Sequence, residues 1–279
     1  MNAVAPSAAE ITRASKSNLA LAFIALPRDR RDDITVFYAW CRVIDDIADD
    51  PGQTEASRRA DLDHWRRALL EPVSDDPALA AAVRALIAKH RLTVGDFHEI
   101  IAGMEMDLDR ATFETWEDLR LYCHRVASVV GLISAEIFGA RDPACRQYAL
   151  DLGLALQITN ILRDVGDDFA NGGRIYLPRA EMELFGYTAA DLAASRHNAA
   201  FLALMDFQAQ RARDFYHAAG TRLPDAERKT MVAAEIMRAI YSRLLEKMQR
   251  ARFRVFGHRY RLTRPHKLAL VAREMWRCR

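Results

Sequence analysis

The sequence predicts an all-α protein with a single domain, and three observations lead to this prediction. Apolar residues recur with the period of a helix through most of the 279-residue chain. No run of alternating β-branched residues bounded by turns is present, so strand signals are nearly absent. Proline and glycine are few, and they lie between the periodic segments. A hydrophobic fraction of 51% can fill a large core, and no linker or internal repeat divides the chain.

Composition argues against several other classes of protein. The net charge of +2 is too small to indicate a partner that binds through the overall charge of the protein. The segment Met1 to Glu10 lacks the pattern of a signal peptide, and we expect about the first eight residues to be disordered. The longest apolar run, Leu19 to Pro27, is too short to span a bilayer. Four widely spaced cysteines without a C-x-x-C pair indicate reduced thiols in a cytoplasmic protein.

The first expected helix runs from Ile11 to Leu26 and contains Lys16 and Ser17 before its apolar half. This polar cluster is either an ordinary helix cap or a lid over phosphate groups, and we keep both residues as candidate substrate-binding residues. The expected helices Ala56 to Leu70 and Pro77 to His90 are amphipathic and carry nothing that requires chemistry.

A polar stripe follows the expected helix Ile34 to Ala48. Tyr38, Arg42, Asp45 and Asp49 are spaced by four, three and four residues, so they fall within about 60° of one another on a helix. Asp107, in the expected helix Val94 to Arg110, is a weak candidate when taken alone. The sequence therefore directs attention to the first stripe.

The segment Tyr122 to Gly131 combines an apolar face with small residues. Tyr122, Val126 and Val130 form that face, and the neighbouring small side chains make the helix thin. The small residues indicate either close helix packing or the wall of a tunnel for a long hydrocarbon, and the sequence leaves both interpretations open.

A second polar stripe lies on the expected helix that carries Asn160, Asp164 and Asp168 at i, i+4 and i+8. Gln157 joins it one turn earlier, and Arg163 stands at its edge. The remaining positions are apolar, so the stripe is expected to face inward, although solvated acidic faces are common on helices. Buried carboxylates are costly unless a positive group neutralises them.

Two facing sets of oxygen ligands suit a hard divalent cation, and Mg²⁺ in particular binds a few carboxylates together with water and substrate phosphates. Arg42, Arg163 and Arg174 would donate hydrogen bonds to the phosphate oxygens. These residues predict metal-assisted departure of a diphosphate.

The C-terminal segment, residues 249–279, is strongly basic and contains interleaved aromatic residues. A solvated helix pair, contact with an anionic membrane surface and RNA binding are three interpretations, and RNA binding ranks last because the rest of the chain is not basic. Tyr241, on a late helix, is a further candidate for the cavity.

Three segments resemble the squalene/phytoene synthase family of head-to-head prenyltransferases. They are Tyr38 to Asp49, Tyr122 to Gly131, and Gln157 to Asp168 continuing into the sequence Arg174-Ile175-Tyr176-Leu177-Pro178. The likeness runs from about Ser15 to Pro178. It implies an isoprenoid-synthase helical bundle with a central cavity, and it implies Mg²⁺ as the cofactor.

The resemblance also implies roles for individual residues. The implied metal ligands are Asp45, Asp49, Asn160, Asp164 and Asp168. The implied catalytic set adds Tyr38 and Arg42 to the four aspartates. The implied substrate-binding residues are Tyr122, Val126, Val130, Gly131, Gln157, Arg163, Arg174 and Tyr176.

We expect condensation of two farnesyl diphosphates to presqualene diphosphate, with onward conversion to squalene if NADPH is used. The alternative within the family is a phytoene synthase that uses geranylgeranyl diphosphate. The alternative from another class is a basic helical module that binds a membrane or RNA.

Overall fold

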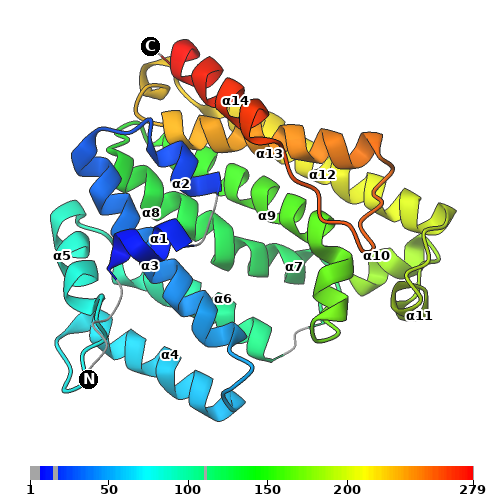
Figure 1. Ribbon diagram of the computed structural model, residues 1–279, viewed down its shortest axis with the longest axis horizontal. Coiled ribbons are helices and arrows are strands. Elements are labelled where there is room, and N and C mark those ends of the chain that lie inside the picture. The colour runs from blue at the N-terminus through cyan, green and yellow to red at the C-terminus, as the bar shows by residue number, and fades with distance from the viewer. Residues whose placement is uncertain (1–6, 15–17, 110–111, 279) are drawn as a thin grey trace.

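The computed structural model describes residues 7–14, 18–109 and 112–278, and this part of the chain is helical without a strand (Figure 1). The helices are α1 (Ala8–Ala14), α2 (Asn18–Phe23), α3 (Arg28–Asp49), α4 (Glu55–Leu70), α5 (Ala80–His90), α6 (Val94–Leu108), α7 (Trp116–Cys123), η1 (His124–Ser128), α8 (Val129–Phe138), α9 (Ala144–Ala170), α10 (Arg179–Leu184), α11 (Ala189–Ala193), α12 (Ala199–Arg222), η2 (Asp225–Glu227), α13 (Val232–Arg250) and α14 (Arg264–Arg277). The all-α prediction is confirmed.

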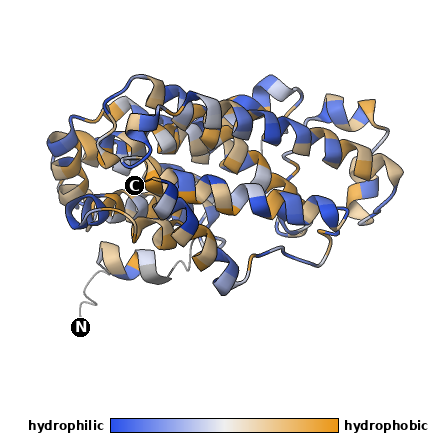
Figure 2. Cartoon of the chain, turned by 90° about the horizontal axis from the view of Figure 1, so that it is seen from above, coloured by the Kyte–Doolittle hydropathy of each residue, from blue (hydrophilic) through white to orange (hydrophobic). Residues whose placement is uncertain are grey.

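The 27-residue helix α9 forms the centre of the bundle (Figure 1). It packs against α7, η1 and α8 and also against α12 and α13, whereas α3 packs against α4, α5, α6 and α8. Hydrophilic and apolar residues alternate around most helices in the view from above (Figure 2). The apolar faces of the amphipathic helices therefore form one shared core, and the polar stripes of α3 and α9 are exceptions to this pattern.

The N-terminal region differs from its prediction. One helix was expected over Ile11 to Leu26, but the structure has two separate helices, α1 and α2. Disorder was expected over about the first eight residues, of which residues 1–6 lie outside the described residues. Helix α1 begins at Ala8, where Ser7 and Glu10 exchange hydrogen bonds across the first turn. Lys16 and Ser17 lie outside the described residues. The next helix also begins earlier than expected, at Arg28.

Helix α7 begins at a capping box, in which the side chains of Thr115 and Asp118 each accept a hydrogen bond from the other residue's backbone N–H. It continues through η1, a single π-helical turn, into α8, and α8 ends at Gly139 with a left-handed φ of 92°. Within the described chain this is the one helix with the length and hydropathy of a membrane span. Half of its most apolar stretch is buried in the bundle, and core helices meet the same criteria.

Close packing explains much of the small-residue pattern around η1. A Cβ atom on Gly153 of α9 would lie 2.5 Å from Ser128 Cα, and one on Gly131 would lie 2.8 Å from the carbonyl oxygen of Ala149. The Ser128 hydroxyl donates a hydrogen bond to the Leu150 carbonyl across the same contact, at 2.8 Å. The backbones of η1, α8 and α9 therefore approach one another where a larger side chain would separate them.

We expect Gly153→Ala to destabilise the fold by about 1–3 kcal/mol, because the added methyl group meets backbone atoms of η1 that cannot rotate away. Thermal denaturation measures this loss. Gly95→Ala is the matched control, since its Cβ would meet only Thr93 Cγ2 at an ordinary 3.5 Å. Equal melting temperatures for the two variants would contradict the packing argument.

Candidate active site

The predicted stripes on α3 and α9 are joined by a third carboxylate, Asp107 of α6. The Tyr176 hydroxyl donates to Asp107 Oδ1 at 2.7 Å, and the Tyr122 hydroxyl donates to Oδ2 at 3.0 Å. The two phenol rings stack with centroids 5.2 Å apart, and Phe113 packs against both. Asp107 therefore organises both predicted aromatic residues, although sequence reasoning rated it weakly. One signal in the sequence could have identified Asp107, because two tyrosines that face the interior need a hydrogen-bond acceptor near both.

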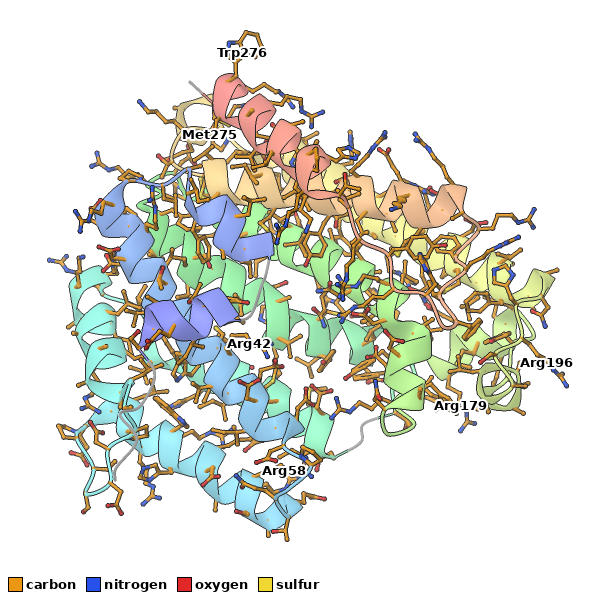
Figure 3. The ribbon with its side chains drawn as sticks, viewed as in Figure 1. Arg42, Arg58, Arg179, Arg196, Met275 and Trp276 are labelled. Atoms are coloured by element: carbon orange, nitrogen blue, oxygen red, sulfur yellow. The ribbon has the colours of Figure 1, made fainter. Side chains whose placement is uncertain are left out.

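Arginines pair with the carboxylates of α3. Arg42 donates to Asp45 at 2.5 Å and to Asp46 at 2.7 Å. Arg174, from the segment after α9, donates to Asp49 Oδ1 at 2.8 Å. This last pair joins residues 125 positions apart, and it brings the end of α9 to the end of α3. Figure 3 shows Arg42 near the middle of the molecule, whereas Arg196 extends from its edge.

On the α9 stripe, Asp164 pairs with arginines, and the Asn160 side-chain nitrogen donates a hydrogen bond to Gln157 Oε1 at 3.4 Å. Asp164 accepts hydrogen bonds from Arg163 on its own helix, and Arg259 Nε lies 3.0 Å from Asp164 Oδ1. The amide oxygen of Asn160 is buried and has no hydrogen-bond partner. The Asp168 carboxylate accepts no side-chain hydrogen bond within the described chain. Sequence reasoning missed Arg259, because the basic C-terminal segment gave no indication of where it would fold.

Burial and mutual repulsion raise the pKa of two of these carboxyl groups. Burial is the main cause for Asp45, whose pKa rises to about 6 although the Arg42 guanidinium opposes the shift. Burial and then repulsion from Asp164 raise the pKa of Asp168 to about 7. Asp107 adds repulsion to both groups, so α3, α6 and α9 contribute to one electrostatic field. The site carries more negative charge than its arginines neutralise.

The residues present fit a magnesium ion. Carboxylate and amide oxygens are the hard donors that Mg²⁺ prefers, and the unpartnered Asn160 oxygen lies on the same stripe as Asp164 and Asp168. Within the described residues, no three Asp, Glu, His or Cys side chains are close enough to hold an ion by themselves. Mg²⁺ normally completes its coordination with water and substrate phosphate, so a partial protein shell agrees with its chemistry.

An apolar cavity of about 200 Å³ begins at Asn160, one helical turn from Asp164 on α9. On α9 its lining extends from Asn160 to Tyr148, twelve residues apart, which corresponds to about 18 Å of helix. The cavity lining includes four residues predicted for a prenyl chain, which are Val126, Val130, Gly131 and Gln157. Tyr241 and Ala127 line it too. The small residues of η1 and α8 thus serve both close packing and the cavity wall.

Most predicted site residues gather on these two features. Tyr38 lies on α3, with its ring edge-on to Phe23 at 6.0 Å, and Phe23 lines the cavity. Arg163 is largely buried by its pairing with Asp164. Lys16 and Ser17 lie outside the described residues. The result is a polar, arginine-rich end joined to an apolar interior.

Comparisons with known proteins agree with this geometry. A family model described as squalene/phytoene synthase matches residues 12–266. The chain is 35% identical to the phytoene synthase of Arthrospira platensis over 84% of its own length and 80% of the relative's. It is also 35% identical to the 15-cis-phytoene synthase of Synechococcus elongatus, over 90% of this chain and 85% of that one.

Two solved structures are similar over most of both chains. A dehydrosqualene synthase in complex with a ligand has a TM-score of 0.84 at 27% identity, covering 96% of this chain and 93% of that one. A squalene synthase from Alicyclobacillus acidocaldarius has a TM-score of 0.77 at 28% identity, covering 88% of this chain and 93% of that one. The chain therefore belongs to the squalene/phytoene synthase family and is an enzyme of the prenyltransferase type.

Proposed function

We propose that this enzyme uses Mg²⁺ to condense two molecules of farnesyl diphosphate head to head, giving presqualene diphosphate. The observation that carries the proposal is the junction of two chemical environments. The apolar cavity reaches Asn160 on α9, and the same helix face continues one turn on to Asp164, which pairs with arginines, and two turns on to Asp168. A diphosphate with a long hydrocarbon tail has these same two parts.

Departure of the diphosphate is the first step. The C1–O bond of the donor breaks, and the electron pair leaves with the diphosphate. Bound Mg²⁺ supplies charge neutralisation for that leaving group. Arg42, Arg163 and Arg174 donate hydrogen bonds to its oxygens, where negative charge develops. The apolar cavity excludes water, which would otherwise quench the allylic cation.

Formation of the ring is the second step. The double bond of the acceptor attacks the donor cation, and loss of one proton closes the cyclopropane. Burial and Asp107 raise the pKa of Tyr122 and Tyr176 above the ordinary value, so both phenols remain protonated and hold Asp107 in place. Neither phenol is then a phenolate base, and we propose the released diphosphate as the proton acceptor.

Geranylgeranyl diphosphate is the second candidate donor. The relatives reported above are named phytoene synthases and favour it, whereas the similar solved structures are named dehydrosqualene and squalene synthases. The hypothesis that the whole chain is a basic membrane- or RNA-binding module is dropped, because the family model spans residues 12–266.

The decisive experiment incubates the purified protein with Mg²⁺ and either prenyl diphosphate, with and without NADPH, and identifies the extracted lipids by mass spectrometry. A thirty-carbon product supports the farnesyl proposal, and its dependence on NADPH shows whether reaction continues to squalene. A forty-carbon product moves the assignment to phytoene synthase. Condensation of neither donor by the folded protein would overturn the proposed function.

The raised pKa values predict the pH dependence of the reaction. The carboxyl groups of Asp45, with a pKa of about 6, and Asp168, with a pKa of about 7, must be ionised to bind a cation. Activity should therefore fall as the pH decreases through this range. Because protons and Mg²⁺ compete for the same oxygens, more Mg²⁺ should move the acidic limb of kcat/KM to lower pH. An acidic limb whose position on the pH axis does not change with the Mg²⁺ concentration would contradict this assignment.

A further inference from the structure

The apolar cavity ends at a side chain that also borders the surface. Phe138, the last residue of α8, lines both the cavity and a separate surface groove of about 730 Å³. Two consecutive residues are divided between the cavity and the groove in the same way. Met231 lines the cavity, and Val232 lines the groove. One layer of side chains therefore separates the interior from the groove, at the end opposite the carboxylates.

Helix α14 presents an apolar stripe to the outside beside this groove. Leu268 is 56% exposed and Trp276 is 73% exposed, with the exposed Ala272 midway between them at helical spacing. Met275, which is 40% exposed, borders the groove directly. Figure 3 shows Trp276 extending outward from the end of α14 next to Met275. Soluble proteins normally cover such a stripe, and in the described chain nothing covers this one.

Basic residues flank the stripe on α14. Glu274 is buried and pairs with Arg273 and Arg277, yet both guanidinium groups stay about half exposed. Burial, and then repulsion from Arg261 and Arg264, lowers the pKa of Lys267, and these three residues form a second positive cluster at the start of the helix. An apolar stripe bordered by arginine and lysine is the pattern of a helix that lies in a membrane interface.

The α2–α3 turn forms the opposite rim of the groove. Ala25, Leu26 and Pro27 line the groove from that side, and the neighbouring Ile24 is 56% exposed. Lys229 adds a positive charge to the lining, and Asp29 is the one acidic residue that lines it in the described chain. Apolar side chains thus surround the groove mouth, and the charges around it are mainly positive.

We propose that the α14 face, defined by Ile24, Leu268, Met275 and Trp276, docks on an anionic lipid bilayer, and that the hydrocarbon product leaves the cavity past Phe138 into that bilayer. The docking rests on the exposed surface alone, whereas the exit route rests on the proposed function. Each exposed basic residue is attracted to an anionic surface, and the apolar stripe supplies the remainder of the attraction. RNA would leave that stripe without a partner.

Vesicle sedimentation tests the docking. The full-length protein is mixed with vesicles of phosphatidylcholine alone or with 30% phosphatidylglycerol added, since anionic headgroups are the proposed partner. We expect binding to the anionic vesicles only, weakened by salt, and at least tenfold weaker for the double variant Leu268→Ser/Trp276→Ser. Leu184→Ser on α10 is the matched control, because Leu184 is 74% exposed but lies away from this face.

Three outcomes would overturn the docking proposal. They are absent binding of the wild-type protein to anionic vesicles, equal loss of binding in Leu184→Ser, and retention on a single-stranded RNA column with no vesicle binding. The tryptophan emission gives an independent readout, because Trp276 should shift to shorter wavelength on binding. Trp40 and Trp65 are buried and should not respond.

Steady-state turnover tests the exit route. Anionic vesicles should raise turnover several-fold, and the Leu268→Ser/Trp276→Ser variant should lose this stimulation. Lys229→Trp should fill the groove and abolish the stimulation while vesicle binding stays equal to that of Lys229→Gln, its control for charge. Unchanged stimulation in Lys229→Trp would overturn the exit route. If neither prenyl diphosphate reacts, the proposed function and the exit fail together, and sedimentation still decides the docking.

Discussion

Asp168→Asn is expected to lower condensation by at least about 10²–10³-fold and at the same time to stabilise the free protein. Activity falls because the site loses a carboxylate that balances the charge of the cation and the leaving group. Stability rises because ionised Asp168 is unfavourable in the folded state, where repulsion from Asp164 adds to the effect of burial. Few substitutions are expected to move these two quantities in opposite directions.

The direction of the stability change follows from the pKa. The carboxyl group of Asp168 has a pKa of about 7 in the folded protein and an ordinary value of 3.8 when unfolded. The unfolded chain therefore releases this proton first, and stability falls as the pH rises from about 4 to 7. Asparagine removes that loss, so the melting temperature of the variant should exceed that of the wild-type protein at pH 7.5 and match it near pH 4.

Asp167→Asn is the matched control for this experiment, because Asp167 is the neighbouring residue on α9 but lies off the stripe. Its activity and melting temperature should both stay close to those of the wild-type protein. Retained condensation in Asp168→Asn would remove Asp168 from the candidate site. A lower melting temperature at pH 7.5 would show that its charge is already compensated.

Glu235→Ala is expected to cause the largest loss of stability, about 3–5 kcal/mol. Glu235 is 1% exposed and accepts two hydrogen bonds from Arg238, at 2.7 and 2.8 Å, and one from the Tyr148 hydroxyl at 2.8 Å. Removing the carboxylate leaves a guanidinium and a phenol without their partner in the interior. The melting temperature should fall by about 6–20 °C.

Glu246→Ala, on the same helix, controls for the loss of an ion pair as such. Glu246 pairs with Arg243 at 2.5 Å but is 48% exposed, and exposed pairs contribute about 0–1 kcal/mol. Similar melting temperatures for Glu235→Ala and Glu246→Ala would contradict the argument from burial. Tyr148 also lines the cavity, so the Glu235 variant should alter substrate binding in addition to stability.

Helical periodicity was sufficient to predict the fold class, and residue spacing was sufficient to predict both polar stripes. These features are local, so Asp45 with Asp49 and Asp164 with Asp168 could be placed on common faces from sequence alone. Asp107 and Arg259 could not be assigned in this way, because their partners are distant in the chain. Asp107 meets Tyr176 across 69 residues, and Arg259 meets Asp164 across 95.

The N-terminal prediction was wrong for a different reason. An apolar run with helical period does not say where a helix begins or ends, and these bounds depend on how α1 packs against α3 and how α2 packs against α13. Close helix packing is confirmed for the small residues near Val130, and the same residues also line an apolar cavity, whereas its use by a hydrocarbon chain stays a prediction. Helix spacing and cavity shape are two properties of the same contact, as Gly131 shows.

The arginine–aspartate pairs of the site have a consequence for the energetics of binding. Before substrate arrives, Arg174 is the counterion of Asp49, and Arg163 and Arg259 are the counterions of Asp164. In the proposed reaction, the metal would become the partner of the aspartates and the diphosphate the partner of the arginines. Binding is then an exchange of counterions among groups that are already paired, and no unpaired charge has to be created in the site.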